Sequence, residues 1–515
     1  MEPKQSIPPI LRPEHVVPVT LGQIAKEFNL TLATGESEIA VTGISMNTGD
    51  LRKGDLFVAM PGKKTHGVNF ITKALEQGAV AVITDSAGRA QILDIAIPVM
   101  VLEKPRTHLG DLAAFVYGNT KGNVPKIFAT TGTNGKTSTT YLLEAILRQL
   151  GRTTGLTSTA ERHIAGEVIV SRLTTPESTE MQALIARMRE RGVTDVAIEV
   201  SAQALTQLRV DGLHFDVSGF TNLSHDHFDD YGGFENYLAA KAELFTKARS
   251  ERAVICLDTE FGQKIVALSE VPVVTIASSQ SKVADWHVQV LEELPGLTKF
   301  SLTGPNNLQL ESSVPIIGAH MAANAGLAIV MAVNAGYEFE AIKRAVAGGI
   351  NAYLPGRTEL VSPVDAPAVY VDFGHSPDAF LNTLAAVRKV TKGKVLMLFG
   401  ADGDRDPSKR GEMARVAAAG CDILVVTDHH PRFEDPASIR KTLVEAAREL
   451  RPELEILEVS PPEAAIRAAV KLVQPGDSIL WAGPGHQDYR DIEGVRTPYS
   501  ARDEARAALG EAGYR

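Results

Sequence analysis

Residues 130–137 constrain the fold of this chain more strongly than any other segment. They read Thr-Thr-Gly-Thr-Asn-Gly-Lys-Thr, directly after the apolar run 126–129 and directly before a helical pattern. A strand, a glycine turn and a helix are the context in which backbone N–H groups and a helix N-terminus bind phosphate. Lys136 would reach the outer phosphates, and the hydroxyl of Thr137 would coordinate Mg²⁺. Since Thr130 stands where the generic motif carries glycine, the alternative is an ordinary glycine-rich turn between a strand and a helix.

The length of the chain and the alternation of its apolar patterns predict three α/β domains. A chain of 515 residues has room for about three domains of roughly 150 residues each. Short apolar runs alternate with amphipathic helical patterns, which favours parallel sheets covered by helices on both faces. We expect the domains to span residues 1–117, 118–354 and 355–515, the second with a parallel sheet and the third doubly wound.

Composition argues against several partners and locations. The net charge of −10 disfavours binding to nucleic acid or to an anionic membrane surface. No apolar run approaches the roughly 20 residues of a membrane-spanning helix, and the N-terminus lacks the apolar core of a signal peptide. Cys256 and Cys421 show no metal-ligand spacing, so we expect them to be reduced packing residues of a cytoplasmic protein.

Two segments of the second block carry side chains suited to a metal or a phosphate. Glu199 ends an apolar strand on the side where the phosphate loop also points, and its carboxylate would suit Mg²⁺. A surface glutamate at a strand end is the alternative. Residues 221–229 are dense in ligand-type side chains, including His227, although loop caps and turn residues explain the same composition. Lys241, in the helix that follows, is by its local pattern a solvated surface lysine.

Polar loops follow four apolar strands of the third block, at residues 372–378, 400–406, 427–432 and 483–487. Because the carboxyl ends of parallel strands meet at one edge of a sheet, four such loops predict a binding site there. His429 and His430 are candidate metal ligands within it, but no third ligand has a convincing spacing.

The phosphate loop and four later segments together resemble the motifs of the Mur ligase family, in the same order: 199–201, 221–224, 372–378 and 403–406. The resemblance extends over nearly the whole chain. It implies that the first domain holds a uridine nucleotide, the second is a P-loop-type ATPase, and the third is Rossmann-like and receives an amino acid. The similar branch of the family adds the third amino acid to UDP-N-acetylmuramoyl-L-alanyl-D-glutamate in peptidoglycan precursor synthesis.

The resemblance also implies the reaction, an ATP-dependent amide ligation. ATP would phosphorylate the γ-carboxylate of D-glutamate, and the amine of the third amino acid would attack this acyl phosphate. Such a site must mainly position the reactants and neutralise phosphate charge. The cofactors would be ATP and Mg²⁺, the partners the UDP-N-acetylmuramoyl-dipeptide and a free amino acid, and the chain would act as a monomer.

Matched motif by motif, the resemblance implies roles for residues in all three domains. ATP would be bound by Gly132, Thr133, Asn134, Gly135, Lys136, Thr137, Asn324, Arg357, Asp372 and His375. Catalysis would depend on Lys136, Lys241 and His227. Mg²⁺ would be held by Thr137, Glu199, His227 and, if it is carbamylated, Lys241. The UDP-linked substrate would contact Thr48, His66, Thr174, Thr175, Ser201, Gln207 and Arg209. The incoming amino acid would contact Arg405, His429, His430, Arg432, Gly483 and Gln487.

Departures from the family pattern bear on the third amino acid. Members that add meso-diaminopimelate usually read Asp-Asn-Pro-Arg where residues 429–432 read His-His-Pro-Arg, and carry glutamate where Gln487 stands. Losing two carboxylates should weaken the binding of a distal ammonium group, since an unpaired charge in a closed pocket is costly. We expect L-lysine or another diamino acid, with meso-diaminopimelate, a neutral amino acid or a different acceptor as alternatives. Gln203 and Met321 also depart from the pattern, but the ATP loop is intact and predicts an active enzyme.

Overall fold

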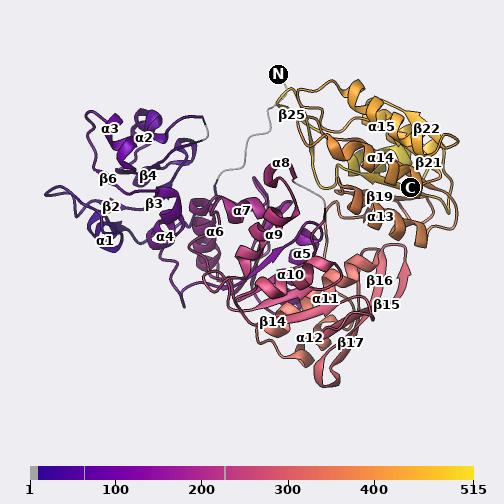
Figure 1. Ribbon diagram of the computed structural model, residues 1–515, viewed down its shortest axis with the longest axis horizontal. Coiled ribbons are helices and arrows are strands. Elements are labelled where there is room, and N and C mark those ends of the chain that lie inside the picture. Colours follow the sequence, from indigo (N-terminus) through magenta and orange to yellow (C-terminus); the bar gives the residue numbers. More distant parts are fainter. Residues whose placement is uncertain (1–9, 63, 225–227, 515) are drawn as a thin grey trace.

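The computed structural model describes residues 10–62, 64–224 and 228–514, which form three α/β regions (Figure 1). The indigo N-terminal region and the orange-to-yellow C-terminal region lie on opposite sides of the magenta central region. This arrangement confirms the three-domain α/β fold expected from the sequence, whereas the domain bounds themselves stay a prediction.

The N-terminal region is built on a parallel sheet whose strands lie side by side in chain order. These strands are β3 (Gly43–Ser45), β4 (Asp55–Ala59), β5 (Ala81–Thr84) and β6 (Val99–Val101). Alternate residues of β4 enter two apolar clusters, Leu56 and Val58 on one face and Phe57 and Ala59 on the other, as the two-residue period of a strand requires. The other elements are β1 (Val19–Thr20), α1 (Leu21–Glu27), β2 (Ala40–Val41), η1 (Thr48–Asp50), η2 (Gly67–Phe70), α2 (Ile71–Glu76), α3 (Ser86–Gln91) and α4 (Pro105–Tyr117).

The central region holds the largest sheet in the described part of the chain, with the strand order β10-β9-β8-β11-β7-β12-β13-β14-β15-β16-β17. The strands from β8 to β15 in this order are parallel, as the sequence predicted. Their bounds are β7 (Lys126–Thr131), β8 (Thr154–Thr157), β11 (Asp195–Glu199), β12 (Val217–Phe220), β13 (Ala253–Cys256), β14 (Val273–Ala277) and β15 (Trp286–Leu294).

Antiparallel strands that the sequence reading did not predict extend this sheet at both edges. They are β9 (Glu161–Ile164), β10 (Glu167–Val170), β16 (Leu297–Thr303) and β17 (Gln309–Val314). Ala165 and Gly166 both have positive φ between β9 and β10, and Gly296 has φ 73° between β15 and β16. Tight turns of this kind reverse the chain into an antiparallel hairpin, whereas a parallel pair needs a crossover of a dozen or more residues.

Helices cover both faces of the central sheet and divide its core in two. On β7, Phe128 packs into one apolar cluster with α5 and α11, and its neighbours Ile127 and Ala129 pack into another with α6 and α9. The helices are α5 (Lys136–Gln149), α6 (Ser178–Glu190), α7 (Ala202–Thr206), α8 (Phe228–Tyr231), α9 (Phe234–Ala242), η3 (Glu243–Phe245), α10 (Glu260–Leu268), η4 (Pro305–Asn307), α11 (Ala319–Asn334) and α12 (Phe339–Val346). β7 is therefore covered by helices on both faces, with α5 on one of them.

The C-terminal region is the predicted doubly wound unit, with the strand order β18-β19-β23-β20-β21-β22. All neighbouring pairs are parallel except β18 with β19. Its strands are β18 (Glu359–Leu360), β19 (Ala368–Asp372), β20 (Val395–Phe399), β21 (Ile423–Val426), β22 (Glu455–Glu458), β23 (Ser478–Ala482) and the separate hairpin β24 (Tyr489–Ile492) and β25 (Val495–Pro498). Its helices are α13 (Pro377–Val390), α14 (Ser408–Gly420), α15 (Pro436–Leu450), α16 (Pro462–Lys471) and α17 (Ala501–Glu511).

The two cysteines and the lengths of the helices also bear on the sequence predictions. Cys256 and Cys421 are free and buried, as expected of packing residues, and burial raises the pKa of the Cys421 thiol to about 12. Within residues 10–62, 64–224 and 228–514, every helix is too short or too polar to cross a membrane.

Candidate active site

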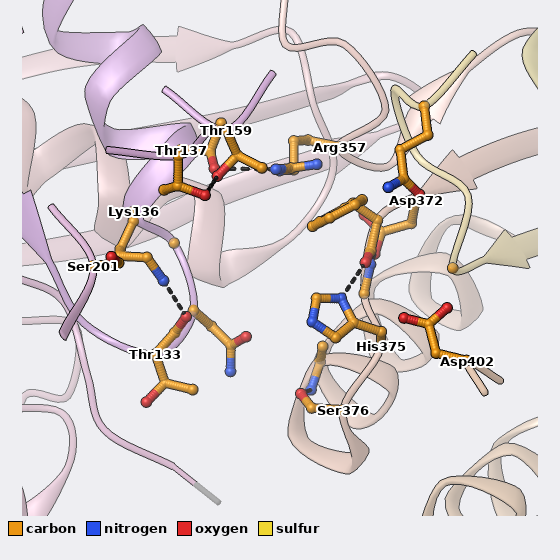
Figure 2. A pocket seen from close by; sticks show the side chains of 18 of the residues that line it. Thr133, Lys136, Thr137, Thr159, Ser201, Arg357, Asp372, His375, Ser376 and Asp402 are labelled. Atoms are coloured by element: carbon orange, nitrogen blue, oxygen red, sulfur yellow. Dashed lines mark hydrogen bonds between the residues drawn. The ribbon is translucent and has the colours of Figure 1, made fainter. Parts of the chain in front are cut away.

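One cavity of about 730 Å³ joins the central and C-terminal regions. It is lined by the loops at the carboxyl ends of strands from both sheets, including those after β7, β11, β19 and β20 (Figure 2). Most of the residues singled out in the sequence line it: Thr133, Asn134, Gly135, Lys136, Thr137, Thr174, Glu199, Ser201, Arg209, Asn324, Arg357, Asp372, His375, Arg405, His429, His430, Arg432, Gly483 and Gln487. The four polar loops of the C-terminal sheet therefore meet at one edge, as the sequence predicted.

The phosphate loop is held in shape by the segment that follows β12. The backbone N–H of Asn134 donates to Asn222 Oδ1 at 2.9 Å, and Thr221 Oγ1 donates to the carbonyl of Asn134 at 2.6 Å. Gly132 has φ 149°, and a Cβ there would lie 1.9 Å from Thr221 Oγ1, so the approach of the two loops requires glycine. Thr130, where the generic motif has glycine, is instead a buried residue of β7.

Lys136 begins α5 at the mouth of this loop. Its Nζ donates to the carbonyl of Thr133 at 2.8 Å, across the turn (Figure 2). Backbone N–H groups at the start of α5 and one lysine thus surround a single concave surface. This arrangement is suited to the β- and γ-phosphates of a nucleotide.

Glu199 and Thr137 lie together behind the loop. Thr137 Oγ1 donates to Glu199 Oε2 at 3.0 Å and accepts a hydrogen bond from Arg357 Nη2, also at 3.0 Å. Thr159 adds two more donors to Glu199, its backbone N–H at 2.8 Å and its hydroxyl at 3.0 Å. Glu199 is 2% exposed, so it is not the surface glutamate that its pattern also allowed. Thr159 was missed in the sequence, because nothing in the local pattern marks the turn before β9.

Lys241 is buried beneath the phosphate loop. Its Nζ donates to the carbonyl of Gly132 at 2.7 Å and lies 4.3 Å from the centre of the Tyr237 ring. The local expectation of a solvated surface lysine is therefore wrong, since the side chain is 1% exposed. His227, the other catalytic candidate of this segment, lies outside the described residues.

The residues expected to contact the UDP-linked substrate divide into two groups. Thr174, Ser201 and Arg209 line the cavity. Just behind the lining, Thr175 Oγ1 donates to the carbonyl of Glu199 at 2.9 Å. Gln207 Oε1 accepts a hydrogen bond from Arg209 Nη2 at 2.7 Å. A second group lies in the N-terminal region, outside the cavity lining. It consists of Thr48, which begins η1, and His66, whose Nε2 lies 3.1 Å from Asp85 Oδ1.

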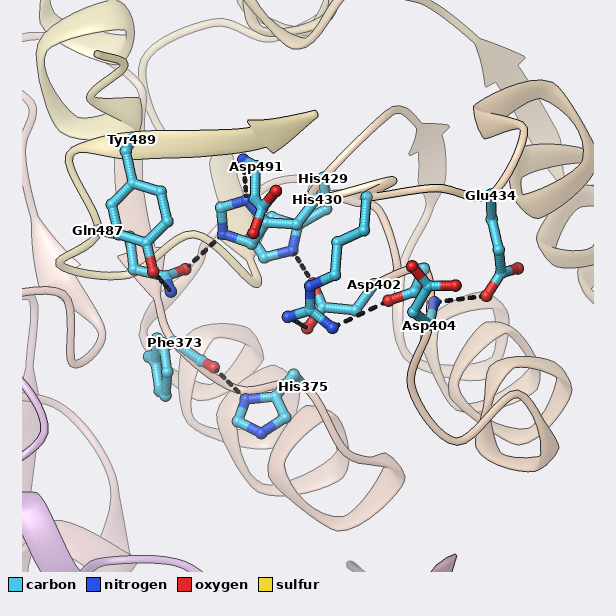
Figure 3. A network of polar contacts seen from close by, with 12 residues as sticks. Phe373, His375, Asp402, Asp404, His429, His430, Glu434, Gln487, Tyr489 and Asp491 are labelled. Atoms are coloured by element: carbon cyan, nitrogen blue, oxygen red, sulfur yellow. Dashed lines mark hydrogen bonds and ion pairs between the residues drawn. The ribbon is translucent and has the colours of Figure 1, made fainter. Parts of the chain in front are cut away.

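The loop after β19 closes the cavity opposite the phosphate loop. Asn134 Nδ2 donates to Asp378 Oδ2 at 2.9 Å, which connects the central and C-terminal regions directly. Asp372 accepts the N–H groups of Thr358 and Gly374 at 2.8 and 2.7 Å, so its carboxylate fixes the loop. His375 Nδ1 lies 2.9 Å from the carbonyl of Phe373 (Figure 3).

His429 and His430 lie at the far end of the cavity, next to a third residue that the sequence did not identify. One potential ligand atom from each of Asp402, His429 and His430 lies within 4.8 Å of the other two. His429 Nδ1 is 2.7 Å from Asp402 Oδ1, and this bond holds the pKa of the Asp402 carboxyl well below its usual range although burial alone would raise it. The geometry therefore supplies the third potential ligand that spacing lacked.

The hydrogen bonds of His430 nevertheless argue against a metal at this position. The backbone N–H of Asp491 donates to His430 Nδ1 at 3.0 Å, which leaves the proton on Nε2, 2.9 Å from Gln487 Oε1 (Figure 3). Both ring nitrogens are thus engaged, and a metal ligand needs a free lone pair. Burial and the neighbouring His429 lower the pKa of His430 to about 4, so His430 stays neutral.

A buried network supports the turn that holds Glu199. His163 Nδ1 lies 3.5 Å from Glu144 Oε1, and its Nε2 lies 3.3 Å from Glu161 Oε2, two residues after Thr159. Burial alone would lower the pKa of His163, but the hydrogen bonds to the two carboxylates outweigh it and raise the pKa to about 9.

We expect this network to make stability fall with rising pH. Because the folded protein binds the His163 proton more tightly than the unfolded chain, its contribution is complete below pH 6.5 and is lost as pH rises through about 9. Urea unfolding between pH 6 and 10 should show a steeper loss for the wild type than for His163→Gln. Parallel curves for the two proteins over that range would contradict the assignment.

Comparison with known proteins agrees with this geometry. Three family descriptions match the chain: Mur ligase family, catalytic domain, over residues 40–117; Mur ligase middle domain over 130–332; and Mur ligase, glutamate ligase domain, over 356–485. A UDP-N-acetylmuramyl-tripeptide synthetase of Leifsonia xyli subsp. xyli is 52% identical, over 98% of this chain and 99% of the relative.

Two diaminopimelate ligases are also similar. The UDP-N-acetylmuramoyl-L-alanyl-D-glutamate--2,6-diaminopimelate ligase of Streptomyces avermitilis is 41% identical, over 97% of this chain and 98% of the relative. A solved structure of a ligase with the same description has a TM-score of 0.67 at 25% identity, covering 97% of this chain and 100% of that one.

Together with a P-loop-type central sheet that shares its cavity with a Rossmann-like region, these matches identify an ATP-dependent amide-forming ligase. Within that class, the chain belongs to the Mur ligase family.

Proposed function

We propose that this enzyme adds the third amino acid to UDP-N-acetylmuramoyl-L-alanyl-D-glutamate in peptidoglycan precursor synthesis. The observation that carries the proposal is the shared cavity. It brings Lys136 of the phosphate loop together with Arg209 and with Arg405 of the C-terminal region. The similar tripeptide synthetase and diaminopimelate ligase support the same reaction. In this proposal the enzyme is a cytoplasmic monomer without nucleic-acid or membrane partners.

The reaction would proceed in two steps. The γ-phosphoryl group of ATP passes to the γ-carboxylate of D-glutamate, which gives an acyl phosphate and ADP. The amine of the incoming amino acid then attacks the acyl carbon, loses a proton and expels phosphate, leaving an amide. Lys136 and Arg357 would neutralise the charge on the transferred group, while the loop N–H groups hold it in line.

The residues around Glu199 fit Mg²⁺. A carboxylate and the Thr137 hydroxyl, 3.0 Å apart and buried, are the hard oxygen ligands that this ion prefers. When bound, Mg²⁺ would offset the negative charge of the ATP phosphates. Lys241 is proposed as a further ligand in carbamylated form, which would replace its ammonium with anionic oxygens directly beneath the loop. Thr48 and His66 of the N-terminal region are proposed contacts of the uridine nucleotide.

We place the domain bounds at 117/118 and 354/355 and the third amino acid among L-lysine and other diamino acids. The meso-diaminopimelate alternative stays open in this proposal, because Arg432 is retained and similar proteins carry that name.

Product analysis tests the proposal. The purified enzyme is incubated with UDP-N-acetylmuramoyl-L-alanyl-D-glutamate, Mg²⁺-ATP and single amino acids, and product mass and phosphate release are recorded. A product one amino acid heavier, formed with one phosphate per turnover, is the expected result. Absence of a product with every amino acid would refute the proposed reaction, and a preference for meso-diaminopimelate would show that His429 and Gln487 were over-interpreted.

A further inference from the structure

Asp491 is a carboxylate of the cavity to which neither the motifs nor the comparisons give a role. It lies on β24, in the hairpin after the last polar loop, and lines the cavity beside His430 (Figure 3). Its backbone is fixed on both sides: its N–H donates to His430 Nδ1 at 3.0 Å, and its carbonyl accepts from the N–H of Arg432 at 3.1 Å. The position of this carboxylate is therefore set by the same segment that forms the end of the cavity.

The other acceptors at this end of the cavity are already engaged. Asp402 binds His429 at 2.7 Å and Arg432 at 3.4 Å. The carbonyl oxygen of Gln487 accepts the proton of His430 Nε2. This turns the Gln487 amide nitrogen toward Tyr489, 3.5 Å away, so the glutamine offers a donor rather than an acceptor.

Asp491 Oδ1 is different, because it is buried and has no hydrogen-bond partner among the described residues. Leaving a charged acceptor unsatisfied costs free energy, so such an atom calls for a missing donor. The nearby arginines contact other groups: Arg432 Nη1 donates to the carbonyl of Gly403 at 2.9 Å, and the Arg496 guanidinium lies 4.4 Å from the centre of the Tyr489 ring.

We propose that Asp491 binds the distal ammonium group of the incoming amino acid, an inference that rests on the proposed function. A charge-assisted hydrogen bond would satisfy Oδ1 and neutralise the ammonium inside the cavity. A distal carboxylate would instead meet Asp491 with like charge. The substrate is thus a diamino acid whose distal end carries an ammonium group alone, as in lysine, ornithine or 2,4-diaminobutyrate.

Steady-state kinetics of Asp491→Asn test this assignment. The amino acids are L-lysine, L-ornithine, L-2,4-diaminobutyrate, L-norleucine and meso-diaminopimelate, each with saturating ATP and dipeptide substrate. The wild type should prefer one of the first three, and the variant should raise its KM roughly 10- to 100-fold. The KM values for ATP and for the dipeptide substrate should change little, since the proposal assigns Asp491 no contact with either.

Glu493→Gln is the matched control, because it removes an exposed carboxylate two residues away on the same hairpin and should leave every KM unchanged. Asp491→Glu, which keeps the charge, should retain more of the preference than Asp491→Asn. An unchanged KM in Asp491→Asn, or a wild-type preference for L-norleucine or meso-diaminopimelate, would overturn the inference.

Failure of the proposed function is a separate outcome. If no amino acid is joined, calorimetric titration of L-lysine and L-ornithine into the wild type and Asp491→Asn still decides the role of Asp491. Tighter binding by the wild type supports it, and equal binding, or none, by both proteins overturns it.

Discussion

Replacing Lys136 with methionine is expected to lower kcat at least roughly 10³-fold. The side chain projects across the mouth of the phosphate loop, 2.8 Å from the Thr133 carbonyl, where the transferred phosphoryl group would lie. Without the positive charge of Lys136 beside the transferred group, the developing negative charge stays uncompensated. Phosphate release under saturating substrates measures the effect.

A matched variant separates the loss of this particular lysine from a folding defect and from the loss of any lysine. Lys121→Met removes a lysine that is 89% exposed and pairs with Glu251 at 3.3 Å on the surface, and it should keep wild-type kcat. Both variants should unfold within a few degrees of the wild type. A loss of less than tenfold in folded Lys136→Met would remove Lys136 from the phosphate-transfer site.

Local patterns were sufficient wherever one strand and its following loop carry the function. The phosphate loop could be recognised because β7, the glycines and α5 are contiguous. The four polar loops of the C-terminal region could be placed together because parallel strands end at one sheet edge. Neither prediction required knowledge of contacts between distant segments.

Contacts between distant segments could not be predicted. Lys241 has an ordinary helical environment in the sequence, yet the Gly132 carbonyl, more than a hundred residues earlier, holds it in the core. Thr159 reaches Glu199 only because β9 turns back onto β8. Asp402 and Asp491 likewise become neighbours of the two histidines through strand pairing and a hairpin, which leave no spacing signal.

The assignments in the N-terminal region depend on the family resemblance. Thr48 and His66 make local contacts, with His66 bound to Asp85, and these contacts do not reveal what binds there. Their roles toward the uridine nucleotide therefore stay predictions.

Replacing Glu199 with glutamine should lower kcat roughly 10²- to 10³-fold and raise the Mg²⁺ concentration needed for half-maximal activity. The amide keeps the shape of the carboxylate but loses its charge, and a neutral oxygen is a weaker ligand for a hard divalent cation. Activity measured over a range of Mg²⁺ concentrations at fixed ATP distinguishes weaker metal binding from a general loss of rate.

The hydrogen bonds of Glu199 allow this effect to be separated from a folding defect. With its oxygen at the Oε2 position, the amide still accepts from Thr137 Oγ1 and from the Thr159 N–H, and only the Thr159 hydroxyl loses its acceptor. The unfolding free energy should therefore fall by only about 1 to 3 kcal/mol. Glu167→Gln, on exposed β10, should leave both activity and Mg²⁺ dependence unchanged. If Glu199→Gln kept the wild-type Mg²⁺ dependence while remaining folded, the carboxylate would be a structural partner of Thr159 and the metal would have to be held elsewhere in the cavity.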